Sequence, residues 1–145
     1  MTVPIKYYSS NEDVTLKFET PGAAGLDLRT LEARILRPGG TFKCDTGIHV
    51  EIPEGYFGLV APRSSTGKLG LRLRNTVGII DSDYRGPIIL SFRNDGDSDV
   101  QLEKGQRLAQ LIVSPYLGIE PIQVDLLKNL SSTHRGVAGF GSTGE

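Results

Sequence analysis

The chain has 145 residues, 38% of them hydrophobic, and a formal net charge of −1. These values predict one domain with its own core and exclude the basic excess of proteins that bind long nucleic acids. The single cysteine excludes an internal disulfide bond, and no run approaches the roughly 20 apolar residues of a membrane span, so we expect a cytoplasmic protein without membrane contacts.

Short apolar runs follow one another along the chain. Turn-forming clusters separate them: PGG (38–40), PEG (53–55), NDGD (94–97) and EKG (103–105). This spacing is typical of proteins with many short strands. Ile48, Val50 and Ile52 alternate with polar residues, which predicts a half-buried strand. Strands with more complete burial are expected at 87–95 and 107–116.

One short helix and a flexible terminus are the expected departures from this pattern. Apolar residues keep helical spacing for no more than two turns, and we expect the helix to begin with Ser64 or Ser65 as its N-cap. Residues 134–145 are rich in glycine and small side chains, so they bury too little apolar area to become ordered alone. The sequence therefore predicts a β domain at 1–133 and a mobile arm at 134–145.

The segment IIDSDYRGP (79–87) leads an apolar run directly into two carboxylates. Asp81 and Asp83 are two positions apart, so in an extended chain both side chains leave the same face. One interpretation is an ordinary turn, because Asp, Ser and Gly-Pro favour turns. The other is a carboxylate base that takes a proton from a bound water.

Two groups of polar residues have the chemistry of a phosphate site. Arg63, Ser64 and Ser65 offer a guanidinium fork and two hydroxyls, although they could equally form the capped start of an ordinary helix. Asp27 and Gln110 stand within apolar, strand-like runs, and either could be a core residue whose hydrogen bonds are satisfied.

The predicted arm offers a further group of side chains. Arg135, Phe140, Ser142 and Thr143 combine a cation, a ring and two hydroxyls on a glycine-rich chain. Such an arm could stack its ring on a base and place its donors on a polyphosphate. The alternative is a disordered terminus with no function.

Five segments resemble, in sequence order, the five motifs of the homotrimeric dUTPases: AGLDLRT (24–30), PRSSTGKLG (62–70), NTVGIIDSDYRG (75–86), GQRLAQL (105–111) and RGVAGFGSTG (135–144). The resemblance implies an all-β, jelly-roll-like distorted barrel subunit, with active sites shared between the three subunits. It further implies that dUTP is hydrolysed to dUMP and pyrophosphate with Mg²⁺, which keeps uracil out of DNA and supplies dUMP for dTMP synthesis.

The resemblance also assigns roles around the nucleoside. Asp81 matches the carboxylate that activates water for attack on the α-phosphorus, and Asp83 falls at a supporting position. Asn75 and Gly78 match a tight hairpin that reads uracil. Tyr84 matches the residue that packs against the deoxyribose, where a 2′-hydroxyl would collide.

The remaining matches concern the phosphates, the metal and the arm. The phosphate-binding positions are Arg63, Ser64, Ser65, Gln110, Arg135, Ser142 and Thr143. Asp27 matches an aspartate near the water shell of a magnesium ion that the triphosphate mainly holds. Phe140 matches the ring that closes over uracil, and Gly141 belongs to the same substrate-binding arm. Val137 and Ala138 differ from the glycine and acidic residues expected there.

Two alternatives to a dUTPase remain. dCTP deaminases and bifunctional deaminase–dUTPases share this fold and resemble PRSS (62–65), but they need an arginine soon after the serines, where this chain has TGKLGL (66–71). The other alternative is a regulatory protein that binds nucleotide, a role for which the sequence shows no added loop.

Overall fold

The structure is a computed structural model that describes residues 2–141. Eleven strands and two short helices occur in this range: β1 (Lys6–Ser9), β2 (Leu26–Arg29), β3 (Arg34–Leu36), β4 (Thr41–Asp45), β5 (Ile48–Glu51), β6 (Tyr56–Pro62), α1 (Ser64–Lys68), β7 (Leu71–Leu73), β8 (Gly78–Ile80), β9 (Ile89–Asn94), β10 (Val100–Leu102), β11 (Arg107–Pro115) and the 3₁₀ helix η1 (Leu127–Asn129). The prediction of an all-β protein is confirmed.

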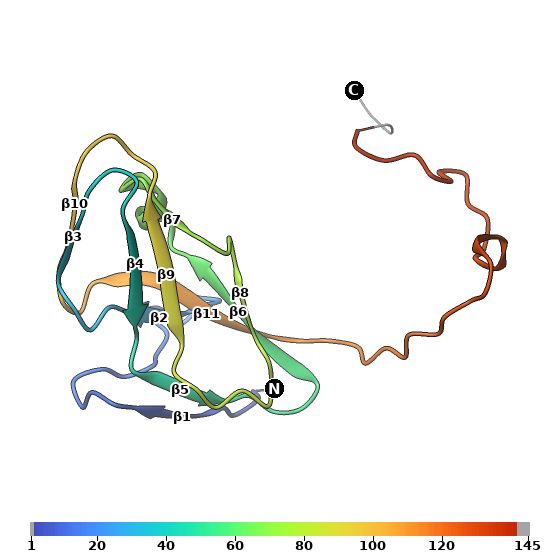
Figure 1. Ribbon diagram of the computed structural model, residues 1–145. Coiled ribbons are helices and arrows are strands. Elements are labelled where there is room, and N and C mark those ends of the chain that lie inside the picture. The colour runs from blue at the N-terminus through green and yellow to red at the C-terminus, as the bar shows by residue number, and fades with distance from the viewer. Residues whose placement is uncertain (1, 142–145) are drawn as a thin grey trace.

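The strands form two larger and two smaller antiparallel sheets. The order β2-β11-β6-β8 makes the four-stranded sheet, and β4-β9-β7 makes the three-stranded one. The pairs β1-β5 and β3-β10 complete the jelly-roll body (Figure 1). Strands distant in sequence are neighbours within every sheet, so residues that stand far apart along the chain meet on one surface.

Alternating side chains from these strands fill one core. Leu28, Leu111 and Phe92 have no solvent exposure. The predicted inward face of β5 is confirmed, because Ile48, Val50 and Ile52 are at most 2% exposed. Together with the other apolar residues of the core they supply the main stabilising term of the fold.

Two details of the sequence-based prediction are wrong. β9 alternates between exposed and buried positions, with Ile89 45% exposed, so the strand within 87–95 has one solvent face rather than full burial. The N-cap of α1 is Arg63, which has extended backbone angles and no capping side-chain bond. Since β6 ends at Pro62, the extended conformation continues through Arg63, and Ser64 and Ser65 become the first helical residues.

Cys44 is buried and 1% exposed, so it packs as a small hydrophobic residue. Burial raises the pKa of its thiol, because the charged thiolate is disfavoured away from water. In the described part of the chain, no helix has the length and apolar character needed to cross a membrane.

The C-terminal segment departs from the body after β11. Every residue from 116 to 141 is exposed, and Figure 1 shows this stretch running away from the sheets in orange and red. The predicted boundary between 133 and 134 stays a prediction, as does the mobility of the arm.

Asn94 is expected to contribute strongly to stability. Its side chain is fully buried and donates to the carbonyls of Leu36 at 2.9 Å and Ser98 at 2.8 Å, while its Oδ1 accepts from Gly96 N at 2.9 Å. Asn94→Ala leaves these groups unpaired, so we expect it to lower the free energy of unfolding by about 2–4 kcal/mol.

Urea denaturation at one fixed protein concentration measures this change. Asn129→Ala is the matched control, because Asn129 is exposed on η1. Equal midpoints for the two variants would contradict the assignment.

Candidate active site

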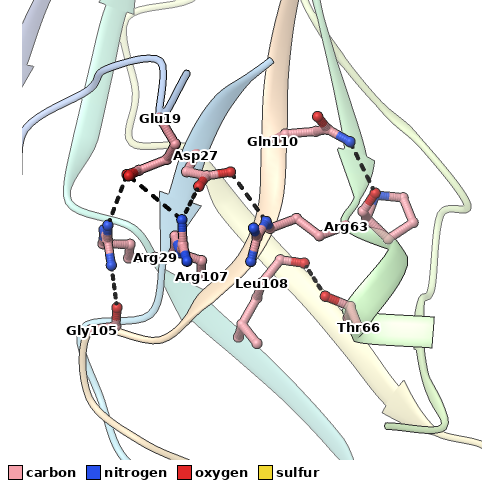
Figure 2. Close-up of polar contacts among 10 residues, drawn as sticks. Glu19, Asp27, Arg29, Arg63, Thr66, Gly105, Arg107, Leu108 and Gln110 are labelled. Atoms are coloured by element: carbon pink, nitrogen blue, oxygen red, sulfur yellow. Dashed lines mark hydrogen bonds and ion pairs between the residues drawn. The ribbon is translucent and has the colours of Figure 1, made fainter. Parts of the chain in front are cut away.

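Asp27 lies between two arginines on the surface of the four-stranded sheet. Its Oδ1 is 3.2 Å from Nε of Arg63, and its Oδ2 is 3.2 Å from Nη1 of Arg107. Figure 2 shows both guanidinium groups directed at this carboxylate. The side chain of Asp27 is only 11% exposed, so the two ion pairs hold it in a partly desolvated position.

The ion pairs continue into a wider polar cluster (Figure 2). Glu19 lies 3.1 Å from Nη2 of Arg29 and 3.6 Å from Nη1 of Arg107. Arg29 also donates to the carbonyl of Gly105 at 3.0 Å. Three guanidinium groups thus face two carboxylates, which leaves one positive charge in excess and suits an anionic ligand.

A polar hollow of about 390 Å³ opens beside this cluster. Its lining includes Arg29, Arg63, Ser65 and Arg107. The predicted phosphate-binding residues Arg63 and Ser65 therefore share one surface, and Arg29 and Arg107 extend it. Such a set of hydroxyl and guanidinium donors can bind the oxygens of a phosphate chain.

Thr66 fixes the start of α1 against β11. Its side chain is completely buried, and its hydroxyl donates to the carbonyl of Leu108 at 2.7 Å. The same carbonyl accepts from the N–H of Arg63 at 3.4 Å. These two bonds fix the start of the helix so that the exposed Ser65 lines the hollow, next to the exposed Ser64.

Gln110 lies opposite Asp27 in the register of β11 and β2. Its Nε2 donates to the carbonyl of Pro62 at 3.4 Å. A methyl group added at Gly25 would lie 2.4 Å from Oε1 of Gln110, so glycine leaves the space that this side chain occupies. The pairing of β2 with β11 and the ion pair of Asp27 with Arg63 thus bring together Asp27, Arg63 and Gln110, which were predicted from separate segments.

The sequence reasoning missed three residues of this cluster, Glu19, Arg29 and Arg107, and of these Arg107 contacts Asp27 directly. Regular alternation would put it on the opposite face from Gln110, three positions later. The register of β11 against β2 shifts between Arg107 and Ala109, and this bulge turns Arg107 to the face that carries Gln110. The only signal in the sequence is the position of Arg107 inside GQRLAQL.

Asn75 and Gly78 lie in the tight connection that leads into β8. Thr76 has a φ of 64°, and the N–H of Val77 donates to the carbonyl of Asn75 at 2.6 Å. A methyl group at Gly78 would come within 3.2 Å of Cβ of Val60, so the connection lies close against β6. Asn75 itself is exposed at the tip.

The segment after β8 forms a turn rather than an extended strand. The N–H of Tyr84 donates to the carbonyl of Asp81 at 3.2 Å, and the hydroxyl of Tyr84 donates to the carbonyl of Pro87 at 2.9 Å. The extended geometry considered for Asp81 and Asp83 is therefore absent. Both carboxylates are nevertheless exposed and line a second hollow of about 810 Å³.

The predicted site residues thus form separate groups within one chain. Among the residues that the structure describes, no hydrogen bond or ion pair joins the Asp27 cluster to the turn with Asp81, and the two hollows share no lining residue. Within residues 2–141, the side chain of Arg135 donates to the carbonyl of Ala138 in its own segment, and Phe140 is fully exposed. Gly141 is exposed as well, while Ser142 and Thr143 lie outside the described residues.

The fit to a metal ion can be judged from the donors of Asp27. Between residues 2 and 141 no group of three or more His, Cys, Asp or Glu side chains is placed to hold a metal ion. Oδ2 of Asp27 already accepts from Arg107 and Oδ1 is ion-paired with Arg63, but each carboxylate oxygen has a further lone pair. The residues therefore fit an ion that is bound mainly by its ligand and contacts Asp27 through water.

Comparisons with known proteins agree with the segments described above. The profile of the dUTPase family matches residues 12–144. A deoxyuridine 5'-triphosphate nucleotidohydrolase of Escherichia phage T5 is 42% identical over 147 residues, which cover 97% of this chain and 98% of the relative. One from Beijerinckia indica is 45% identical over 132 residues, covering 88% and 81% respectively.

Solved structures give the same result for the fold. A dUTPase of Staphylococcus bacteriophage 80alpha with dUpNHpp has a TM-score of 0.88 and 26% identity, and the match covers 99% of this chain and 100% of that one.

Proposed function

The chain belongs to the dUTPase family, and from this premise we propose that it hydrolyses dUTP to dUMP and pyrophosphate by in-line attack of water on the α-phosphorus. Its enzyme class is that of its relatives, dUTP diphosphatase. The observation that carries the proposal is the family match over residues 12–144, which includes every segment with a candidate site residue.

The phosphate chain of dUTP would bind at the polar hollow. Arg63 and Ser65 supply hydrogen-bond donors from its lining, and Ser64 and Gln110 would supply further donors from positions beside it. Arg135, Ser142 and Thr143 of the arm would complete the contacts to the terminal phosphates. Donors aimed at the phosphoryl oxygens stabilise the negative charge that grows on them and on the leaving pyrophosphate.

The nucleoside would bind at the connection before β8 and at the following turn. Asn75 offers an amide that can pair with the edge of uracil, and the close approach of Gly78 to β6 leaves little space for a larger base. Tyr84 would contact the sugar, and Phe140 would cover the uracil ring. Asp81 would accept a proton from the attacking water, since its carboxylate opens into the adjoining hollow.

Mg²⁺ would be held mainly by the phosphates of dUTP, with Asp27 as its outer contact through water. When bound, the ion neutralises charge on the phosphoryl oxygens. Asp27 would orient the water molecules around it while Arg63 and Arg107 keep the carboxylate in place. Arg63 would at the same time bind a phosphate directly. Its ion pair with Asp27 would therefore also hold in place one of the donors that bind the substrate.

A homotrimer with shared active sites is part of the proposal. The groups that bind phosphate and nucleoside lie apart in one chain, so neighbouring subunits would combine them. Support comes from the segment after β11, where Leu117, Ile119 and Ile122 are 87%, 85% and 79% exposed. An apolar hollow of about 370 Å³ is lined by Ile5, Leu16, Phe18, Leu26 and other residues. A second copy would cover these apolar surfaces.

We further propose that the enzyme acts in the cytoplasm, where it keeps uracil out of DNA and supplies dUMP for dTMP synthesis. The lone Cys44 suits a reducing compartment. The biological role follows from the chemistry, because hydrolysis of dUTP removes the uracil nucleotide from the pool available to a polymerase and yields dUMP.

A pyrophosphate-release assay with dUTP, dCTP, dTTP and UTP tests the proposed function. We expect turnover of dUTP to exceed that of the other three nucleotides by at least about a hundredfold, because the steric walls at Gly78 and Tyr84 exclude a 5-methyl group and a 2′-hydroxyl. Ammonia release from dCTP would favour the deaminase instead. Binding of dUTP without any turnover would favour a regulatory binder.

A further inference from the structure

The turn that carries Asp81 is held by its backbone rather than by the carboxylates themselves. In the described part of the chain, the side chains of Asp81 and Asp83 make no hydrogen bond or ion pair. The position of the Asp81 carboxylate is therefore set by the geometry of the turn. A general base must lie within hydrogen-bond distance of the water it activates, so whatever fixes the turn also fixes the base.

Arg85 ties the carbonyls of this turn together. Its Nη1 donates to the carbonyl of Ser82 at 2.6 Å and to that of Tyr84 at 3.0 Å. Arg85 shares the 810 Å³ hollow with Asp81 and Asp83, yet these backbone carbonyls are the partners of its guanidinium. The guanidinium of Arg85 therefore acts on the backbone of the turn rather than on either carboxylate.

His49 connects Arg85 to the β1-β5 sheet. Its Nδ1 lies 2.8 Å from the carbonyl of Arg85, and since a carbonyl oxygen only accepts, Nδ1 carries the hydrogen. Tyr8 is the cross-strand partner of His49, and the two rings lie 5.6 Å apart at an angle of 58°. The N–H of Ile88 also donates to the carbonyl of Ile48 at 2.8 Å, so the chain after the turn follows β5.

We propose that Arg85 and His49 are positioning residues that hold the Asp81–Tyr84 turn in the geometry in which Asp81 acts as the base. The inference rests on the proposed function. Arg85 fixes the shape of the turn through two carbonyls, and His49 anchors Arg85 to a strand of the body. Both side chains act through the turn, because their hydrogen bonds go to its backbone carbonyls.

Four single substitutions test this inference on the full-length chain. We expect Arg85→Ala to lower kcat about tenfold and His49→Ala about threefold, since they remove two exposed hydrogen bonds and one respectively. KM for dUTP should change less than kcat, because the proposed uracil and phosphate contacts lie in other segments and only the sugar contact of Tyr84 belongs to the turn. His49→Asn should restore kcat, as its amide N–H can donate to the carbonyl of Arg85 in place of Nδ1, whereas His49→Leu should not.

Hydrogen–deuterium exchange of a peptide covering 81–88 gives a readout that does not depend on turnover. The N–H of Tyr84 bonds within the turn, so exchange should accelerate in Arg85→Ala and His49→Ala and return to the parent rate in His49→Asn. Arg37→Ala is the matched control, because this exposed arginine lies outside the turn and should leave both kcat and exchange unchanged.

The possible failures can be told apart. If the parent releases no pyrophosphate from dUTP, the proposed function fails and this inference falls with it. If the parent is active and exchange accelerates while kcat stays unchanged, the bonds exist but do not position the base. If kcat of His49→Asn is as low as that of His49→Ala, the hydrogen bond to the carbonyl of Arg85 does not position the base, and the inference is overturned.

Discussion

Asp81→Asn is expected to lower pyrophosphate release from dUTP by about 10²- to 10⁴-fold, the usual contribution of a positioned general base. The amide has nearly the same shape as the carboxylate but no longer accepts a proton from water. Affinity for an imido analogue of dUTP, measured by calorimetry, should stay within about threefold of the parent, because the uracil and phosphate contacts proposed above do not use this side chain.

Asp83→Asn is the matched control for this result. Asp83 belongs to the same turn and lines the same hollow, so its replacement makes the same change of charge two positions away. We expect turnover to fall by less than about tenfold. Equal losses in the two variants would mean that the charge of the hollow, and not one base, drives the reaction. Parallel loss of turnover and analogue affinity in Asp81→Asn would make Asp81 a binding or folding residue.

Much of the strand framework could be predicted because its determinants are local. Alternation placed Ile48, Val50 and Ile52 on the buried face, and turn-forming clusters marked the ends of strands. The position of the helix was also predicted, but its N-cap was not. The extended backbone of β6 continues through Arg63, so Arg63 occupies the N-cap position. The preference of serine for this position does not decide where the helix begins.

The cluster around Asp27 shows what the residues alone could not give. From the sequence, Asp27 and Gln110 could each have been a core residue whose hydrogen bonds are satisfied. Only the pairing of β2 with β11 makes them neighbours on a partly exposed surface. Arg107 was missed because a bulge reverses its expected face, and bulges depend on register between strands that are distant in sequence. The nearest sequence signal was the family motif that contains it.

The turn after β8 illustrates the opposite case. Its local sequence favours a turn, and the structure has one, yet the functional role of Asp81 rests on the family resemblance. Periodicity cannot separate a structural carboxylate from a catalytic one. The hydrogen bonds from Arg85 and His49 add the physical reason why this turn, unlike an ordinary surface turn, would present a carboxylate in one fixed place.

Ending the chain at Thr133 is expected to lower turnover of dUTP by about a hundredfold or more without unfolding the protein. The shortened chain lacks Arg135 and the hydroxyls of Ser142 and Thr143, and loss of even one donor to developing charge costs about 10²-fold. It also lacks the segment that would exclude bulk water when closed. Stability should be preserved, because the described residues beyond 133 are all exposed and Arg135 bonds within its own segment.

A second shortened chain, ending at Pro115, separates closure from assembly. It removes the exposed apolar residues between 116 and 130 as well as the arm, so we expect it to lose the proposed trimer in sedimentation experiments, whereas the chain ending at Thr133 should keep it. Phe140→Ala removes only the ring. It should raise KM for dUTP and should affect assembly less than the cut at Pro115 does. Full activity after removal of 134–145 would reduce the arm to a passive terminus. Loss of the trimer by the same cut would mean that the arm acts through subunit association and not by covering bound dUTP.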